Sequence, residues 1–505
     1  MLYFTFLMIQ LLEFCIFCIF FSYLPGNCLK YAACLFFFYF FERQQTKFLR
    51  KLFTIEFASG MDLVFNYEDN QNKSTIISCT IITENFNENF KALISKNIEK
   101  EKKYHKLKEI LYHNTFFAYW KKDPKYNPDN HFEFIDKELK DEKEIYQKMG
   151  EELSTPFPND HPKWKFFVFK KYKKTKGAVI MKFHHSLVDG ISLLSFFLKS
   201  CEVENVKFVK MPKISMLKWI FIYISLPVLG VYYLFMNVIK KQDRNKIHNF
   251  ELSGKKKVFT LQMNRNLTDL KVISKGLRIS INDLFTSVLM ECLQEYYKDK
   301  FKEEFKESIM FMPVSMRSLP PPGITCPLNN TMITLFAKMK MIKGDDKELV
   351  AKGYGKMLTT LKNSLEAPIL FLLIHYAPKL LPNFVFQNFY KFMAIKPSLG
   401  FTNVPGPLEE VKYGRASIEN IFFYVPTVSS IGLGFSLFTY NNKLMFGVQA
   451  DEKTQINPEM FTKKYEQVMD IYIDQAMKRA GGNPNKTNTN TKGEKKPTKG
   501  EKKKK

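Results

Sequence analysis

The segment between residues 177 and 200 constrains the fold of this chain more than any other. A β-like apolar run (177–183) leads into His184-His185-Ser186-Leu187-Val188-Asp189-Gly190, and an apolar, helix-like run (191–198) follows. This order places the two histidines at the end of a strand, on a short loop before a helix. The sequence therefore predicts an α/β unit with an imidazole at the strand end.

His184 and His185 suit proton transfer, because histidine is the side chain whose unperturbed pKa lies near neutrality. Adjacent residues of a strand point to opposite faces, so two neighbouring imidazoles are poorly placed to share one metal ion. We therefore expect no metal site. The alternative is a purely structural histidine pair, in which Asp189 is a turn residue and Gly190 adopts positive φ.

Further motifs accompany the histidines in a fixed order over residues 61–480, and together they resemble the wax ester synthase/diacylglycerol acyltransferase family. They are Met61-Asp62-Leu63-Val64-Phe65, Pro162-Lys163-Trp164, Asn282-Asp283, Pro313-Val314-Ser315-Met316-Arg317, Asn403-Val404-Pro405-Gly406-Pro407 and the segment from Gly432 to Asp451. Lys163 and Thr402 depart from the family pattern, which usually has Leu and Ser there. The resemblance implies an α/β (α+β) fold of two chloramphenicol-acetyltransferase-like domains with mixed sheets and an active-site tunnel between them.

The resemblance also implies roles for single residues. His185 would be the general base that accepts the proton of the acceptor hydroxyl and then protonates the departing CoA sulfur, while His184 helps to hold the loop. Asp189 would pair with Arg317 and fix that loop, and Gly190 would let the backbone turn into the next helix. An exposed charge at a strand end is the alternative for Arg317.

Asn282 has two interpretations that the sequence leaves open. Its amide could donate to the oxyanion or orient a substrate oxygen. It could instead be the N-cap of the helix that follows, a common place for Asn. Asn403, Pro405 and Gly406 are expected to shape a crossover between the two halves or to line the tunnel, and a structural role is favoured for them.

The net charge of +26 suits anionic partners, such as a membrane surface or the phosphates of CoA. No zinc-finger spacing or nucleic-acid motif accompanies this charge, so no nucleic-acid partner is expected. Residues 1–45 are predicted to form a membrane anchor, because the first 24 residues carry one charge, Glu13, and are long enough to span a bilayer. The resemblance begins at Met61, so a mis-assigned extension is the alternative for the first 60 residues.

Basic residues that follow the apolar stretch ending at Phe41, such as Arg43 and Lys47, favour a cytosolic catalytic body, and we expect the membrane to be the endoplasmic reticulum. A second apolar segment, 214–239, is interrupted by Pro227 and Gly230. A true crossing there would separate the halves that must form one site. We therefore predict a monotopic or re-entrant hairpin broken near Pro227, with a buried core helix as the alternative.

The predicted organisation is an N-terminal half (61–213), a linker (240–257), a C-terminal half (258–480) and a disordered basic tail (481–505). Residues 104–160 read as helix and loop. Residues 365–393 are apolar and interrupted by prolines, which suits the lining of a lipid tunnel or contact with a membrane. Strands are predicted at 74–83, 165–172, 177–183, 258–263, 308–314, 331–338, 433–440 and 443–450, and helices at 88–103, 191–198, 267–276, 283–298, 345–362 and 458–479.

The expected function is transfer of a fatty acyl group from acyl-CoA, as co-substrate, to a long-chain alcohol, to diacylglycerol or to both. No bound cofactor is expected, and the lipid bilayer is an expected partner. Two alternatives remain. One is acylation of another lipophilic alcohol such as a sterol, and the other is a catalytically silent, membrane-bound lipid-binding protein that keeps the fold.

Overall fold

The computed structural model describes residues 55–69, 75–86, 89–113, 118–201, 214–248, 251–317, 325–413, 416–427 and 429–479. The predicted anchor (1–45) and the predicted basic tail (481–505) lie outside these residues.

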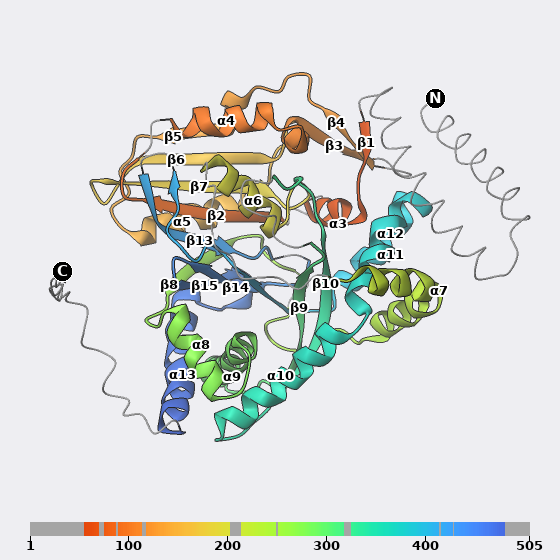
Figure 1. Ribbon diagram of the computed structural model, residues 1–505, viewed down its shortest axis with the longest axis vertical. Helices are drawn as coiled ribbons and strands as arrows, with labels where there is room; N and C mark the ends of the chain where they lie inside the picture. Colours follow the sequence, from red (N-terminus) through yellow and green to blue (C-terminus); the bar gives the residue numbers. More distant parts are fainter. Residues whose placement is uncertain are drawn as a thin grey trace, which may run out of the picture.

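Two six-stranded mixed sheets, one from each half, form the centre of the molecule (Figure 1). The N-terminal sheet has the order β12-β13-β2-β7-β6-β5. Its strands are β2 (Ile76–Thr83), β5 (Phe132–Ile135), β6 (Trp164–Tyr172), β7 (Lys176–His184), β12 (Lys412–Tyr413) and β13 (Ala416–Tyr424). The C-terminal sheet has the order β10-β9-β11-β14-β15-β8. Its strands are β8 (Lys256–Gln262), β9 (Glu307–Ser315), β10 (Met332–Lys340), β11 (Leu399–Val404), β14 (Leu433–Tyr440) and β15 (Lys443–Asp451).

The central strands form where the sequence has uninterrupted apolar runs between turn signals. All eight residues of β2 are buried, as is most of β7, because helices and the other sheet cover both faces. The turn between β14 and β15 is made by Asn441 and Asn442, which both have positive φ, the conformation that a tight hairpin turn requires. The predicted strands of the two central hairpins are therefore present.

Helices cover the outer faces of the sheets. The C-terminal sheet packs on α8 (Leu267–Gly276), α9 (Ile281–Phe301) and α13 (Pro458–Arg479), and α10 (Lys347–Asn363) packs on α9. In the N-terminal half, α4 (Phe90–Lys100), α5 (Glu142–Ser154) and α6 (Gly190–Ser200) fill the same role. Each half has its own apolar core, so the fold class predicted from the sequence is confirmed.

Residues 104–160 contain strands that the sequence analysis missed. β3 (Glu109–His113) and β4 (Ala118–Lys122) pair with β1 (Ile55–Phe57) in a small third sheet, and β5 joins the edge of the N-terminal sheet. The interpretation of this region as helix and loop was wrong for these segments, whose short strands mix apolar and charged residues.

The chain crosses between the two halves after β11. β11 lies in the C-terminal sheet, whereas the next long strand, β13, pairs antiparallel with β2 in the N-terminal sheet. Gly406 lies in the crossover, and a Cβ there would be 2.1 Å from the Thr439 carbonyl oxygen, so no side chain fits. The crossover thus adds two strands of the C-terminal half, β12 and β13, to the N-terminal sheet.

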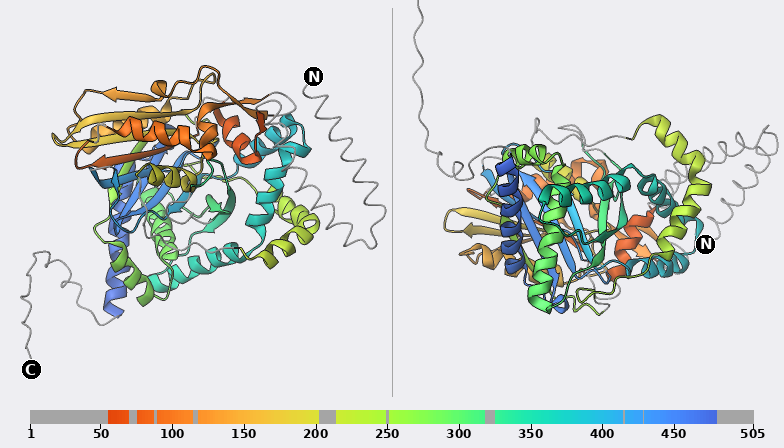
Figure 2. Two further views of the ribbon diagram at one scale, coloured as in Figure 1. Left: turned by 45° about the horizontal axis from the view of Figure 1, so that its top comes forward. Right: turned by 90° about the horizontal axis from the view of Figure 1, so that it is seen from below.

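The apolar segment that begins at residue 214 forms one continuous helix, α7 (Met216–Ile239). The predicted break at Pro227 is wrong: the proline lies inside the helix, where its missing N–H removes one backbone hydrogen bond of a 24-residue element. One side of α7 packs on α11 (Glu366–Leu380), and Gly230 allows close contact with Leu373. The other side lies at the edge of the molecule (Figure 2).

α7 is also the one helix in the described part of the chain that is long and apolar enough to cross a membrane by length and composition, or one of two if the bent pair α10–α11 is a single span. Only 11% of its apolar window is buried, which is far less than a core helix would bury. The alternative of a buried core helix is therefore wrong for this segment.

The segment after α7 is anchored to the C-terminal half. Asp243 is buried and accepts hydrogen bonds from the backbone N–H of Ile309 (2.8 Å) and from the Ser398 hydroxyl (2.6 Å). Lys396, also buried, donates to the last carbonyls of α7. β8 then begins at Lys256, inside the predicted linker (240–257).

Candidate active site

The histidine loop joins β7, which ends at His184, to α6, which begins at Gly190. The His185 backbone N–H donates to the Thr75 carbonyl (2.9 Å), which continues the pairing of β7 with the segment before β2. His184 is fully buried, and its Nδ1 accepts from the Ser186 N–H (3.2 Å) and lies 2.7 Å from the Ser186 hydroxyl. His184 therefore contacts the loop itself, while His185 is directed elsewhere.

His185 is held from two directions. Its ring stacks on Phe65 of α3 (Gly60–Asp69), with a centroid distance of 3.7 Å and an interplanar angle of 17°. Its Nδ1 lies 3.1 Å from the Asn330 side-chain oxygen. Burial lowers the pKa of His185 to about 4, so the imidazole is neutral at physiological pH. A neutral, immobilised imidazole is the state that a general base requires.

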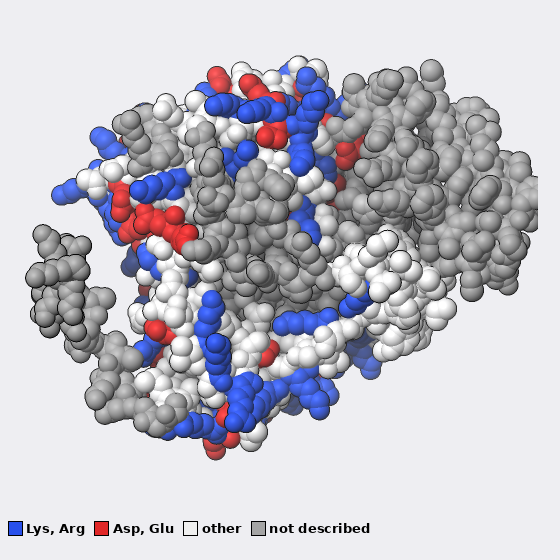
Figure 3. All heavy atoms as spheres, in the orientation of Figure 1, with Lys and Arg blue, Asp and Glu red and all other residues white. Residues whose placement is uncertain are grey.

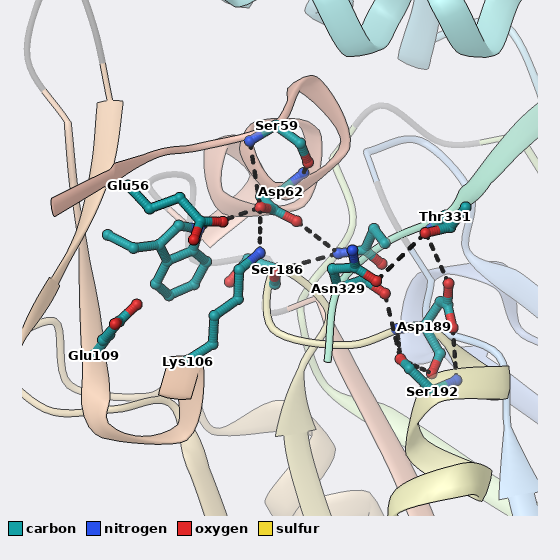
Figure 4. Close-up of polar contacts among 12 residues, drawn as sticks. Glu56, Ser59, Asp62, Lys106, Glu109, Ser186, Asp189, Ser192, Asn329 and Thr331 are labelled. Carbon is teal, nitrogen blue, oxygen red and sulfur yellow. Dashed lines mark hydrogen bonds and ion pairs between the residues drawn. The ribbon is translucent and has the colours of Figure 1, made fainter. Parts of the chain in front are cut away.

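Asp189 is turned away from His185 and forms the ion pair with Arg317 that the sequence analysis expects. Arg317 Nη2 lies 3.0 Å from Asp189 Oδ2. The carboxylate also accepts from the N–H groups of Ser192 (2.8 Å) and Thr331 (2.9 Å), and Asp189, Ser192 and Thr331 are labelled in Figure 4. The contact with the Ser192 N–H makes Asp189 the N-cap of α6. Arg317 further donates to the Asn329 carbonyl (2.7 Å), so it ties the histidine loop to the segment before β10.

Gly190 does not have the positive φ that one interpretation required. It is the first residue of α6 and has ordinary helical geometry. A Cβ there would lie 3.6 Å from both Phe423 and Val404, in van der Waals contact. Gly190 lines a small apolar cavity with these two residues, so the missing side chain leaves room between the two halves.

Asn282 and Asn403 contact each other. The Asn403 amide donates to the Asn282 side-chain oxygen (2.6 Å). The N-cap of α9 is Ser280, which forms a capping box with Asp283, so the N-cap interpretation of Asn282 was wrong. Pro405 and Gly406 follow Asn403 and begin the crossover described above.

The sequence analysis missed a group of buried residues behind His185: Asp62, Lys106, Trp120 and Asn330, which we call the Asp62 network. Asp62 accepts from Lys106 (2.7 Å), from the Trp120 indole (3.2 Å) and from the Asn330 amide (3.2 Å). Burial raises the pKa of Asp62, but the Lys106 ammonium and these donors outweigh it, and the pKa lies below its usual value. Asp62 belongs to the first family motif, whereas no local signal marked Asn330.

An apolar cavity of about 420 Å³, within the usual range for ligand pockets, borders the face of α3 next to the one that carries Asp62 and Phe65. α3 contributes Met61 and Val64 to its wall, one residue before Asp62 and Phe65 respectively. The remaining wall is mostly aliphatic and aromatic and comes from α7, β9, β10, α11 and α12 (Asn383–Ala394). α3 therefore borders both the Asp62 network and a chamber suited to a hydrocarbon chain.

Two family models match this chain. The wax ester synthase/diacylglycerol acyltransferase catalytic domain matches residues 59–207, and the WS/DGAT C-terminal domain matches residues 328–472. The chain belongs to this family. It is therefore an O-acyltransferase. The two matched regions contain the histidine loop and Asn330, respectively.

Curated relatives agree with this assignment at low identity. The chain is 21% identical over 355 residues to wax ester synthase/diacylglycerol acyltransferase 1 of Arabidopsis thaliana, covering 63% of this chain and 73% of that protein. It is 21% identical over 365 residues to the O-acyltransferase WSD of Acinetobacter baylyi, covering 66% and 78%.

Solved structures show the same fold. The wax ester synthase/diacylglycerol acyltransferase from Marinobacter aquaeolei VT8 superimposes with a TM-score of 0.56 at 16% identity, covering 82% of this chain and 98% of that chain. The trichothecene 15-O-acetyltransferase of Fusarium sporotrichioides gives a TM-score of 0.57 at 12% identity, covering 83% and 94%. Acyl-CoA is the family's co-substrate. Among the described residues, no group of three or more His, Cys, Asp and Glu could hold a metal ion.

Proposed function

We propose that this protein transfers a fatty acyl group from acyl-CoA to the hydroxyl of a long-chain alcohol, of diacylglycerol or of both, at a membrane surface, with His185 as the general base. The observation that carries the proposal is a neutral, buried imidazole stacked on Phe65 of α3, beside an apolar cavity lined by Met61 and Val64 of the same helix. A hydrophilic acceptor would lose its hydrogen bonds to water in such a cavity and gain none from its aliphatic and aromatic wall.

The reaction needs no covalent enzyme intermediate. His185 Nε2 accepts the acceptor hydroxyl proton as the oxygen attacks the thioester carbonyl. The tetrahedral intermediate then collapses, the carbon–sulfur bond breaks, and the imidazolium returns the proton to the CoA thiolate. Base catalysis of this kind contributes roughly 10²–10⁴-fold to the rate.

Asn282 is the proposed amide donor to the oxyanion or to a substrate oxygen. Its side-chain oxygen is engaged by Asn403, so its Nδ2 is the group that remains to donate. In this proposal Asn403, Pro405 and Gly406 keep the crossover in the shape that sets this amide, while Asp189, Gly190 and Arg317 shape the loop that carries His185.

The cavity opens at an exposed apolar surface. Three residues line the cavity and are also 37–43% exposed, so they form its mouth: Leu234 of α7, Leu381 between α11 and α12, and Val385 of α12. Around this mouth lies a set of exposed apolar side chains that we call the α7–α12 surface. Its members are Met216, Leu217, Phe221, Ile224, Val228, Val231 and Phe235 of α7 and Phe384, Val385 and Phe392.

The α7–α12 surface suits a lipid bilayer. Figure 3 shows the area around α7 without acidic side chains and with basic ones at its border, and Lys218, Lys240 and Lys241 flank the helix ends. A single crossing by α7 would carry α6 and β8 to opposite sides, yet both pack in one body. We therefore propose that α7 lies in the membrane interface, where fatty alcohol or diacylglycerol dissolves and enters the cavity mouth.

Labelled oleoyl-CoA, the full-length protein and a panel of hexadecanol, dioleoylglycerol and cholesterol in liposomes provide the test. We expect ester formation with hexadecanol, dioleoylglycerol or both, a loss of at least about 10²-fold in kcat for His185→Ala, and a smaller loss for the matched variant His184→Ala. Product only from cholesterol would replace the acceptor class. Near wild-type turnover by His185→Ala would overturn the mechanism, and no product with any acceptor would favour a silent lipid-binding protein.

A further inference from the structure

The hydrogen bonds around Asn330 define which nitrogen of His185 carries the proton. We propose that Asn330 is a positioning residue that keeps His185 protonated on Nδ1 and unprotonated on Nε2, and that Asp62, held by Lys106, fixes the orientation of the Asn330 amide. The inference rests on the proposed role of His185 as the general base, and it adds residues that act on the base without touching the substrate.

The orientation of the Asn330 amide follows from its partners. Its nitrogen lies 2.7 Å from the His185 carbonyl oxygen, 3.2 Å from the Ser186 carbonyl oxygen and 3.2 Å from Asp62 Oδ1. All three partners are acceptors, so a reversed amide would place an oxygen against three oxygens at a buried site. The Asn330 side-chain oxygen must therefore face His185 Nδ1.

The tautomer of His185 then follows. A carboxamide oxygen can only accept, so the imidazole must donate from Nδ1 across the 3.1 Å contact. The lone pair is left on Nε2, which is the nitrogen that the proposed reaction uses. Asn330 also donates to the His185 carbonyl oxygen, so it contacts both the ring and the backbone of that residue.

α3 supplies the support for this arrangement. Asp62 and Phe65 are three residues apart and share one face of the helix, so the same face holds the Asn330 amide and stacks on the His185 ring. Asp62 is fully buried, and Lys106, whose side chain is 4% exposed, neutralises it at 2.7 Å. The carboxylate thus orients the base through an amide, without direct contact with the imidazole.

Selective 15N labelling of histidine in the full-length protein tests the proposal, because the 15N shifts of an imidazole distinguish the two tautomers. In the wild type we expect the His185 signals of the Nδ1-protonated form. Asn330→Ala should move them toward the Nε2-protonated form and lower kcat about 10–100-fold, with the KM for acyl-CoA changed less than about twofold. Asn329→Ala is the comparison variant for the tautomer alone: it removes a contact of Arg317 and can lower kcat through the loop, but it leaves the ring contact intact, so the Nδ1-protonated signals should stay.

A second variant covers the case in which Asn330→Ala does not fold. Asn330→Ser keeps a polar group but is too short to reach both the ring and Asp62, so it should show the same change of tautomer with a smaller loss of kcat. An unchanged tautomer, or full kcat, in a folded Asn330 variant overturns this inference alone. If instead His185→Ala keeps its turnover, the proposed base is wrong, and the two failures are thereby distinguished.

Discussion

The Asp62 network and the α7–α12 surface both depart from the usual placement of side chains, with charges outside and apolar groups inside, but in opposite directions. The network buries a lysine and an aspartate completely, whereas the surface exposes ten large apolar residues on two helices. Charged residues are seldom fully buried unless they are paired, and contiguous exposed apolar area usually marks an interaction site. Neither placement is what stability alone would favour, and the cavity that runs from α3 to α7 lies between them.

The two regions differ in where their side chains find interaction partners. Every oxygen of Asp62 has a partner within the protein, so the network is rigid and closed to water. The outer face of α7 has no such partners among the described residues, and a bilayer would supply them. The molecule thus separates a dry polar region that orients the base from an apolar region that admits the substrate.

The largest expected effect is on the stability of the polar region. Lys106→Met leaves the Asp62 carboxylate buried without its counter-charge and should cost about 3–5 kcal/mol of unfolding free energy. The double variant Asp62→Asn with Lys106→Met should recover most of that loss. Thermal melting of the purified proteins gives the comparison, with Lys165→Met as the control, because the exposed pair of Lys165 and Glu133 should contribute less than about 1 kcal/mol. Equal losses in both variants would contradict a special role for burial.

The Asp189–Arg317 pair should respond similarly but less strongly. Arg317→Ala and Asp189→Asn each remove one partner of a mostly buried pair and should cost up to about 3 kcal/mol, together with activity, because the histidine loop loses its tie to residues 326–331. Melting temperature and kcat should fall together in both variants. Lost activity with unchanged melting temperatures would show that Asp189 acts on the chemistry and not on the loop.

The α7–α12 surface should show the reverse pattern, with binding changed and folding unchanged. Phe221→Glu with Val228→Glu places two charges where we propose that lipid lies, and should weaken binding to liposomes by on the order of tenfold or more. Flotation assays measure this, and the melting temperature should not change. Val272→Glu is the control, since Val272 is 67% exposed on α8, away from this surface. Equal binding by both variants would remove the surface from the proposal.

The smallest expected effect is of pH on the rate. Because burial lowers the pKa of His185 from 6.5 to about 4, the base stays neutral in the folded protein, and kcat/KM should be flat between about pH 7 and 5.5. Stability behaves differently. The unfolded chain binds the proton first, so the contribution of His185 is fully present above pH 6.5 and is lost as pH falls toward 4. An acid limb of kcat/KM near pH 6.5 would mean that the ring is hydrated in the working enzyme.

The sequence predicted the elements that depend on local pattern. β2, β6, β7, β14 and β15 are long apolar runs between turn signals, and their hairpins follow from that pattern alone. β11 and β13 were missed, because both are short or mixed in polarity and find their partners in distant parts of the chain. The sequence analysis predicted a break at Pro227, but α7 continues through this proline as one helix.

The residues of the site divide in the same way, into those that a local pattern marks and those that only tertiary contacts reveal. His185, Asp189 and Arg317 could be named from motifs, since each belongs to a conspicuous pattern at a strand end. Asn330 could not, because its significance lies in contacts to residues 145 and 268 positions away. Asn282 was misread as a possible N-cap because Ser280, two residues earlier, offers the better capping box with Asp283.

The insertion of β13 into the N-terminal sheet has a consequence for biosynthesis. β7 ends at residue 184 and β13 begins at residue 416, so 232 residues must be translated before β2 receives its second neighbour. At usual elongation rates this takes about 12–46 s. For that interval the nascent chain carries the unpaired edge of a strand that is wholly buried in the folded protein, the kind of edge that recruits other chains. The ribosome must therefore deliver most of the polypeptide before its first-made sheet is closed.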